Sequence, residues 1–208
     1  MTARGRFITI EGVEGVGKST NLRFIETWLS ERGIPYLTTR EPGGTALGES
    51  VRELLLARSE SPMDAMTELL LMFAARAEHV VQVIRPALAA GSWVISDRFT
   101  DSSYAYQGGG RGIPASTIAA IEQAALGDFK PDATLLLDLP VASGLDRAAQ
   151  TGAKDRFELE SMAFFDRVRA VFLSRAAEDA RFEVVDASRG IDAVQSDIAD
   201  WLTRESAR

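Results

Sequence analysis

Eight consecutive residues, Gly12-Val13-Glu14-Gly15-Val16-Gly17-Lys18-Ser19, match the phosphate-binding pattern G-x-x-x-x-G-K-[ST] in full. Glycines are needed there because successive backbone N–H groups must converge on phosphate oxygens without β-carbons in the way, and a following helix adds the positive end of its dipole. We predict that the segment from Gly12 to Thr20 binds a nucleotide, with Lys18 at the β- and γ-phosphates and Ser19 offering its hydroxyl to Mg²⁺. The alternative, an accidental glycine-rich turn, fits poorly between a strand-like and a helix-like run.

Two apolar runs end in an aspartate that could orient Mg²⁺ or its waters, namely Trp93–Asp97 and Leu135–Asp138. We favour Asp97, because Arg98 and a polar, aromatic stretch follow it, and ligands of α/β proteins bind at the carboxyl ends of strands. Asp138 is expected to be an ordinary carboxylate at a strand end.

The elements that must position these residues follow from the hydrophobic pattern. Short apolar, β-branched runs alternate with longer helical stretches, which predicts βαβ units and a five-stranded parallel sheet. The predicted strands are Phe7–Glu11, Tyr36–Thr39, Trp93–Ser96, Thr134–Asp138 and Phe182–Val185. Helices are expected over Leu22–Leu29, from about Thr45, from about Asp64, from Ile113 to Leu126, over Leu159–Phe172 and over Ile191–Leu202. The order of the strands cannot be read from this pattern.

Length and composition limit the class of protein. The 208 residues, 46% apolar and 25% charged, predict a single α/β domain spanning residues 1–208. A net charge of −7 argues against binding DNA or RNA, so any phosphate site must be a local pocket. The absence of cysteine excludes disulfides and thiolate metal sites, and the lone His79 cannot build a zinc site. No signal peptide or membrane span is evident, so we expect a cytoplasmic protein without membrane contact.

Four ordered blocks of the sequence resemble a known family. They are Phe7–Thr20, Arg40-Glu41-Pro42-Gly43-Gly44-Thr45, Asp97–Phe99 with Ser102–Gly108, and Asp155-Arg156-Phe157-Glu158. Together they resemble the bacterial thymidylate kinases over nearly the whole chain. The resemblance implies a three-layer P-loop kinase fold with a short mobile lid at about residues 150–157. It also implies transfer of the γ-phosphoryl group of ATP to dTMP, giving dTDP and ADP on the way to dTTP, with Mg²⁺ and as a homodimer.

The resemblance also implies a dTMP site, built from Glu41, Pro42, Arg52, Phe73, Arg76, Arg98, Ser102, Ser103, Tyr106 and Gln107. In it, Arg98 and Arg52 hold the dTMP phosphate and Glu41 takes the sugar 3′-hydroxyl. Pro42 packs near the nucleoside, and Tyr106 occupies the place of a ribose 2′-hydroxyl. The thymine is surrounded by Arg76, Ser103 and Gln107.

Two positions depart from the family pattern. The aromatic side chain expected on thymine is often four residues before the base-binding arginine, but here Phe73 precedes Arg76 by three and Met72 takes the other position. We choose Phe73, with plain core packing as its alternative. A second departure is a lid with few cations, in which Arg156 is our candidate for the catalytic cation, ahead of Lys154 and then Arg147.

Phosphoryl transfer between two nucleotides gathers negative charge, so several cations are needed besides the phosphate-binding loop and Mg²⁺. The candidates are Arg40, Arg52, Arg76, Arg98 and Arg156. Because the acceptor phosphate is already ionised near neutral pH, no general base is required, and catalysis is assigned to Lys18, Asp97, Arg98 and Arg156. We expect His79 to have no catalytic task and the three tryptophans to serve packing.

Two other functions remain open from the residues. A regulatory GTPase would carry an [NT]-K-x-D motif, which the sequence lacks. A kinase acting on another nucleoside monophosphate would keep the same machinery. A kinase acting on a deoxynucleoside would need a base for the 5′-hydroxyl, for which Glu41 or Asp97 could serve.

Overall fold

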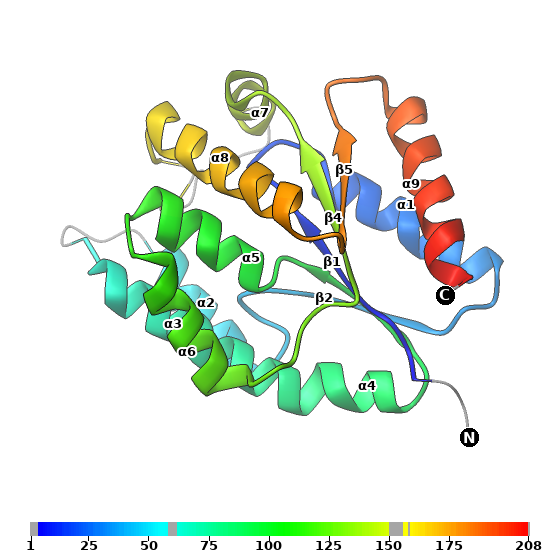
Figure 1. Cartoon of the computed structure of the whole chain (residues 1–208), viewed down its shortest axis with the longest axis horizontal. Coiled ribbons are helices and arrows are strands. Elements are labelled where there is room, and N and C mark those ends of the chain that lie inside the picture. Colours follow the sequence, from blue (N-terminus) through cyan, green and yellow to red (C-terminus); the bar gives the residue numbers. More distant parts are fainter. Residues whose placement is uncertain (1–3, 58–61, 150–155, 158, 208) are drawn as a thin grey trace.

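The structure, a computed structural model, describes residues 4–57, 62–149, 156–157 and 159–207. Within these ranges the chain forms a five-stranded, all-parallel sheet in the order β2-β3-β1-β4-β5 (Figure 1). The strands are β1 Phe7–Glu11, β2 Tyr36–Arg40, β3 Trp93–Asp97, β4 Ala133–Asp138 and β5 Phe182–Asp186. The five predicted strands are confirmed, with their bounds within one residue of those predicted.

The helical elements surround this sheet on both faces, giving three layers. In chain order they are α1 Lys18–Glu31, α2 Ala46–Leu56, α3 Ala65–His79, the π-helical η1 Val80–Ile84, α4 Arg85–Ala89, α5 Thr100–Ser103, the π-helical η2 Tyr104–Gly110, α6 Ala115–Leu126, α7 Val141–Ala148, α8 Met162–Glu178 and α9 Ile191–Ser206. Helices α1 and α9 lie together on one side of the sheet, whereas α3, α5, α6 and α8 lie on the other (Figure 1). The predicted α/β fold, a parallel sheet flanked by helices, is therefore confirmed.

The register of the central strands brings the predicted chemistry together. All five residues of β1 are buried, as expected for the middle strand of a parallel sheet. Ile10 of β1 is aligned with Asp97 of β3, and Arg40 of β2 is aligned with the same aspartate. Because parallel strands end at the same edge, the phosphate-binding loop after β1 lies beside the residues that follow β2 and β3.

Two predicted helix starts are confirmed by their caps. The Thr45 side chain accepts from Gly48 N at the start of α2, and Asp64 accepts from Met66 N and Thr67 N at the start of α3. The prediction that a helix begins at Leu159 is wrong, because Ser161 caps α8 and Leu159 is exposed before it. Trp28, Trp93 and Trp201 are all buried, as predicted for packing residues.

The sequence pattern missed α7 and the π-helical η2. Helix α7 has only eight residues and follows Pro140, so its period is hard to see. Segment η2 ends in three glycines, and a β-carbon on Gly110 would lie 2.4 Å from the ring of Phe164 in α8. Gly109 and Gly110 are therefore needed for close packing of η2 on α8. None of the described helices is both long and apolar enough to cross a membrane.

Candidate active site

A cavity of about 520 Å³ lies at the carboxyl ends of the strands, a volume suited to a small-molecule ligand. Its lining includes residues 14–20, Glu41, Pro42, Arg52, Met72, Arg76, Asp97, Arg98, Ser102, Ser103, Tyr106, Gln107, Arg147 and Phe157. Among these described residues, five side chains are cationic (Lys18, Arg52, Arg76, Arg98, Arg147) and three are acidic (Glu14, Glu41, Asp97). The cavity is thus locally positive in a chain whose net charge is −7, as a site for polyanions must be.

The phosphate-binding loop has the backbone that its glycines predict. Gly15 adopts a left-handed φ of +74°, and a β-carbon there would lie 1.9 Å from the Gly144 carbonyl oxygen of α7. Gly17 precedes α1, and no side chain of the part of the chain that the structure describes caps the N-terminus of that helix. The first N–H groups of α1 are therefore available to an anion, with the helix dipole behind them.

The backbone of the phosphate-binding loop holds the side chain of Lys18 in place. Its ammonium Nζ donates to the carbonyl oxygens of Gly12 at 3.1 Å and Val13 at 3.2 Å. Burial and the nearby Arg98 guanidinium lower the pKa of Lys18 from its ordinary value. Gly12 and Val13, predicted to bind the nucleotide, contact Lys18 and do not line the cavity.

Arg98 connects both sides of the cavity. Its Nη1 donates to Gly12 O and to Ser102 Oγ, both at 3.1 Å, while Nη2 donates to Tyr106 Oη at 3.0 Å and to Glu14 Oε1 at 3.2 Å. Its φ of +76° lies in the left-handed region, which is rare for a residue with a β-carbon. Such strain persists only where surrounding contacts over-determine it, which is typical of functional sites.

Tyr106 completes this cluster. Its hydroxyl donates to the Glu14 carboxylate, with both oxygens at 2.8 Å. Burial, with the Glu14 carboxylate adding to it, raises the pKa of Tyr106 well above its ordinary value, so the phenol remains a donor at neutral pH.

Glu11 supports the loop that carries Arg98, and sequence reasoning missed it. The carboxylate of this last residue of β1 is fully buried, and it accepts from Phe99 N at 2.8 Å and from Ser102 Oγ at 2.6 Å. Burial, with a contribution from the nearby Asp101 carboxylate, raises the pKa of Glu11 to about 7. The sequence did contain a signal for this role, because Glu11 ends an apolar strand. A carboxylate buried at such a position needs hydrogen-bond partners.

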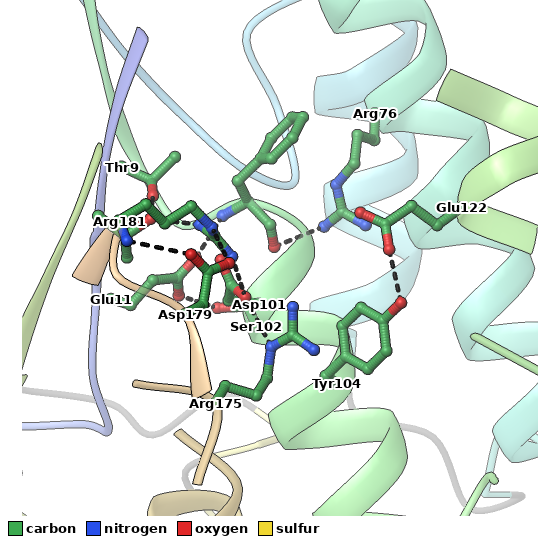
Figure 2. Close-up of polar contacts among 12 residues, drawn as sticks. Thr9, Glu11, Arg76, Asp101, Ser102, Tyr104, Glu122, Arg175, Asp179 and Arg181 are labelled. Carbon is green, nitrogen blue, oxygen red and sulfur yellow. Dashed lines mark hydrogen bonds and ion pairs between the residues drawn. The ribbon is translucent and has the colours of Figure 1, made fainter. Parts of the chain in front are cut away.

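Figure 2 shows how α5 is fixed beneath the site. Asp101 is fully buried, and its Oδ1 accepts from Arg175 Nε of α8 and from Arg181 Nη2 next to β5, both at 2.7 Å. The neighbouring Tyr104 donates to Glu122 of α6 at 2.6 Å. The Asp101 contacts join α5 to α8 and to the residue before β5, and the Tyr104 contact joins the adjacent η2 to α6. Helix α5 carries Ser102 and Ser103, which line the cavity.

Arg76 of α3 lies on the acceptor side and is almost fully buried. Its three guanidinium nitrogens donate to Glu41 Oε2 at 2.6 Å, Ser103 Oγ at 2.9 Å and Phe99 O at 3.0 Å. Arg76, Glu41 and Ser103 are distant in sequence and predicted to bind one nucleoside, and the structure brings them together.

The structure does not place Phe73, our choice for a thymine-facing residue, at the cavity. Phe73 is buried in the hydrophobic core, with the Arg76 guanidinium 4.7 Å from its ring centre, and it does not line the cavity. Met72, the alternative, lines the cavity. Successive side chains of an α-helix are rotated by about 100° around its axis, so Met72 and Phe73 face different surroundings.

Arg156 is not placed at the phosphate-binding loop. It forms an ion pair with the fully buried Glu68 of α3 at 2.8 Å and donates to Leu55 O at 2.9 Å. Glu68 also accepts from Gln107 at 2.8 Å and pairs with Arg111. Sequence reasoning missed this buried carboxylate. Residues 150–155 of the predicted lid, including Lys154, lie outside the described residues, whereas Phe157 lines the cavity.

Of the remaining candidate residues, Asp97 lines the cavity, whereas Arg40 and Asp138 form ion pairs with other residues. Arg40 is exposed and pairs with Glu49 at 2.8 Å. Asp138 forms two hydrogen bonds with Arg169 at 2.7 and 2.8 Å, in agreement with its interpretation as a strand-end carboxylate. Asp97 lines the cavity, and its buried Oδ1 has no hydrogen-bond partner among the described residues.

A second cavity of about 360 Å³ adjoins the loop. It is lined by Gly15, Val16, Gly17, Thr20, Asn21, Arg147, Ala187, Arg189, Ile191 and Val194. Arg147 of α7 lines both cavities. The phosphate-binding loop therefore lies between two spaces, as the meeting point of two ligands requires.

Comparisons with known proteins agree with this geometry. The family model described as thymidylate kinase matches residues 10–198. The thymidylate kinase of Pseudomonas syringae pv. tomato is 57% identical over 199 residues, 95% of each chain, and that of Teredinibacter turnerae is 55% identical over 93% of this chain and 95% of its own. A crystal structure of thymidylate kinase from Ehrlichia chaffeensis superposes with a TM-score of 0.76 at 35% identity, covering 96% of this chain and 99% of the other. The chain therefore belongs to the thymidylate kinase family and has the P-loop kinase fold.

Proposed function

We propose that the larger cavity binds dTMP with its phosphate toward Arg98, and that ATP enters from the other side of the phosphate-binding loop. As a thymidylate kinase, the chain transfers the γ-phosphoryl group of ATP to dTMP, giving dTDP and ADP. The observation that carries our proposal is the position of Arg98, which contacts the loop at Gly12 and Glu14 and the acceptor side at Ser102.

The residues of the chain supply position and charge rather than proton transfer. Lys18 and the N-terminus of α1 hold the β- and γ-phosphates, and Arg98 and Arg52 hold the acceptor phosphate. The acceptor oxygen is already ionised, so the reaction needs the two phosphates aligned and their repulsion neutralised. No residue is asked to act as a general base.

On the nucleoside side, we assign the sugar and the base to separate groups. Glu41 accepts from the 3′-hydroxyl, Pro42 packs nearby, and Tyr106 fills the place of a ribose 2′-hydroxyl. The thymine lies among Arg76, Ser103 and Gln107, and Ser102 supports Arg98. All of these residues line the one cavity, which supports this arrangement.

A coupled assay of ADP release with ATP, Mg²⁺ and one nucleoside monophosphate at a time tests the acceptor. We expect dTMP to be the best substrate. Equal or higher rates with another monophosphate, or with thymidine, would contradict the assignment. The GTPase alternative would require tight GTP binding without any acceptor.

We assign Mg²⁺ to Ser19 and Asp97. Within the described ranges the buried Oδ1 of Asp97 has no hydrogen-bond partner, and this atom and the Ser19 hydroxyl fit the ion. Mg²⁺ is usually held by one or two carboxylates together with substrate phosphates and water. When bound, Mg²⁺ supplies charge neutralisation at the β- and γ-phosphates. Among the described residues no group of three or more acidic, histidine or cysteine side chains forms a metal site of its own, which suits an ion that arrives with the nucleotide.

For the additional cation we propose Arg147, because it lines both cavities. Arg156, our first candidate from the sequence, can act at the phosphates only if it leaves Glu68. The second cavity is our proposed site for the adenosine part of ATP.

We further propose a homodimer formed through α2 and α3. These adjacent helices carry exposed apolar side chains, Leu47 and Leu54 on α2 and Met66 and Leu70 on α3, and exposed apolar patches commonly mark protein interfaces. Sedimentation velocity of the wild-type chain and of Leu54→Glu tests this. A monomeric wild-type chain would contradict it.

The chain is proposed to act as one catalytic domain in the cytoplasm. The lack of cysteine suits a reducing compartment, and both proposed cavities share the phosphate-binding loop. Fractionation of cells that express a tagged chain tests the location.

A further inference from the structure

His79, the single histidine of the sequence, forms a buried connection behind the cavity. It ends α3, one helical turn after Arg76, so the two side chains project from the same face of that helix. Its Nδ1 lies 2.9 Å from Glu41 Oε1, and its Nε2 lies 2.7 Å from Thr39 Oγ1 of β2. The ring therefore joins β2 to the acidic residue that follows it.

The hydrogen-bond partners of His79 indicate which ring nitrogen carries the proton. A carboxylate can only accept, so the nitrogen that faces Glu41 carries the proton and donates it. In a neutral ring the other nitrogen then accepts from the Thr39 hydroxyl. Each oxygen of Glu41 thus has its own donor, His79 on Oε1 and Arg76 on Oε2. These two donors restrict the χ3 angle of Glu41, whose distribution in glutamate is otherwise broad.

The ring itself has little room to rotate. Gly44 adopts a left-handed φ of +79°, and a β-carbon on it would lie 2.5 Å from His79 Nε2. The turn that contains Gly44 therefore packs directly on the ring. Glu41 lines the cavity, whereas His79 does not. His79 is therefore connected to the cavity by its hydrogen bond to Glu41.

We propose that His79 is a positioning residue, which holds the Glu41 carboxylate in the orientation that accepts the 3′-hydroxyl of the acceptor sugar and so sets the preference for acceptors with that hydroxyl. This inference rests on the proposed role of Glu41. Without the His79 donor, Oε1 loses its partner and the carboxylate can turn away from the sugar. Contacts of the phosphate with Arg98 do not depend on this hydrogen bond.

Two nearly isosteric variants test the hydrogen bonds of the two ring nitrogens separately. In His79→Asn the amide nitrogen lies close to the position of Nδ1 and can still donate to Glu41. In His79→Gln it lies close to Nε2 and can reach only Thr39. Each variant is assayed with dTMP and with 3′-deoxythymidine 5′-monophosphate. We expect the ratio of kcat/KM for the two acceptors to fall roughly tenfold in H79Q, the loss expected for one hydrogen bond to a charged group, and to change little in H79N. The KM for ATP should stay constant.

Glu41→Gln, assayed in parallel, tells apart the ways in which this inference can fail. If E41Q loses the preference for the 3′-hydroxyl but H79Q keeps it, His79 does not position Glu41 and only this inference is overturned. If E41Q keeps the preference, the proposed role of Glu41 fails and the inference fails with it. An equal loss on both acceptors in H79Q shows a purely structural role and also overturns it.

Nuclear magnetic resonance of the unsubstituted protein tests the inference even if the variants fold poorly. Because there is one histidine, the imidazole nitrogen signals of protein labelled with ¹⁵N-histidine need no assignment by mutation. We expect a protonated Nδ1 whose signal shifts when dTMP binds and shifts much less with the 3′-deoxy analogue. The same response to both nucleotides would overturn the proposal.

Discussion

The guanidinium of Arg98 donates to the carboxylate of Glu14 at 3.2 Å, which joins the loop after β3 to the phosphate-binding loop after β1. Both side chains line the cavity, and the Tyr106 hydroxyl lies between them, within 3.0 Å of each. The group proposed to hold the acceptor phosphate is therefore already fixed beside the donor site before either nucleotide binds, which limits the reorganisation that the reaction requires.

Replacing Arg98 with alanine should lower kcat for dTMP phosphorylation by about 10³-fold or more, the effect of removing a cation that neutralises a transferring phosphoryl group. Steady-state rates with saturating ATP and dTMP measure this. Arg204→Ala is a matched control, because Arg204 is exposed and pairs with Glu183 on the surface, and it should keep full activity. A kcat for R98A within tenfold of wild type would remove Arg98 from the mechanism.

The buried Glu11 makes the stability of the chain depend on pH. Its pKa is about 7 in the folded state against 4.5 in the unfolded chain, so the folded state retains the proton more strongly. The stabilisation is fully present below pH 4.5 and is lost as the pH rises through 7, up to about 3 kcal/mol in total. Glu11→Gln cannot ionise and should lack this loss.

Urea unfolding of both proteins at pH 5 and pH 8 tests this prediction about Glu11. Relative to wild type, E11Q should gain free energy of unfolding between the two pH values. Parallel behaviour of the two proteins would show that Glu11 titrates in the folded state as it does in the unfolded chain.

The third prediction separates the two candidate arginines for the additional cation. Arg147→Ala should raise the KM for ATP by about tenfold and leave the KM for dTMP nearly unchanged, because a charged hydrogen bond to the donor nucleotide is lost. Arg156→Ala should mainly lower stability, since it takes a cation from the buried Glu68. Initial rates and thermal unfolding of both variants measure these effects. A larger fall of kcat in R156A than in R147A would show that Arg156 leaves Glu68 during turnover.

The sequence predicted those features that depend on local pattern. The strands, the caps at Thr45 and Asp64 and the phosphate-binding loop each follow from short-range spacing. Glu11, Glu68 and His79 were not predicted as parts of the site, because their partners lie 38 or more residues away along the chain, and periodicity carries no information about such pairs. The sequence could not decide between Met72 and Phe73 for a related reason. Both neighbours are apolar, and only the packing of α3 decides which one faces the cavity.

That packing leads to the last prediction, which concerns the methyl group of thymine. One methyl group in an apolar pocket is worth about 1–3 kcal/mol, so wild type should prefer dTMP to dUMP by roughly 10- to 200-fold in kcat/KM. Because Met72 lines the cavity, Met72→Ala should lower this ratio. Phe73→Leu is the control, since Phe73 is buried in the core beside Arg76, and it should reduce stability by about 1 kcal/mol while largely keeping the ratio. Rates with both monophosphates and thermal unfolding of each variant decide the matter. Loss of the preference in F73L but not in M72A would restore the aromatic ring as the group that contacts thymine, and would require α3 to rotate when the nucleotide binds.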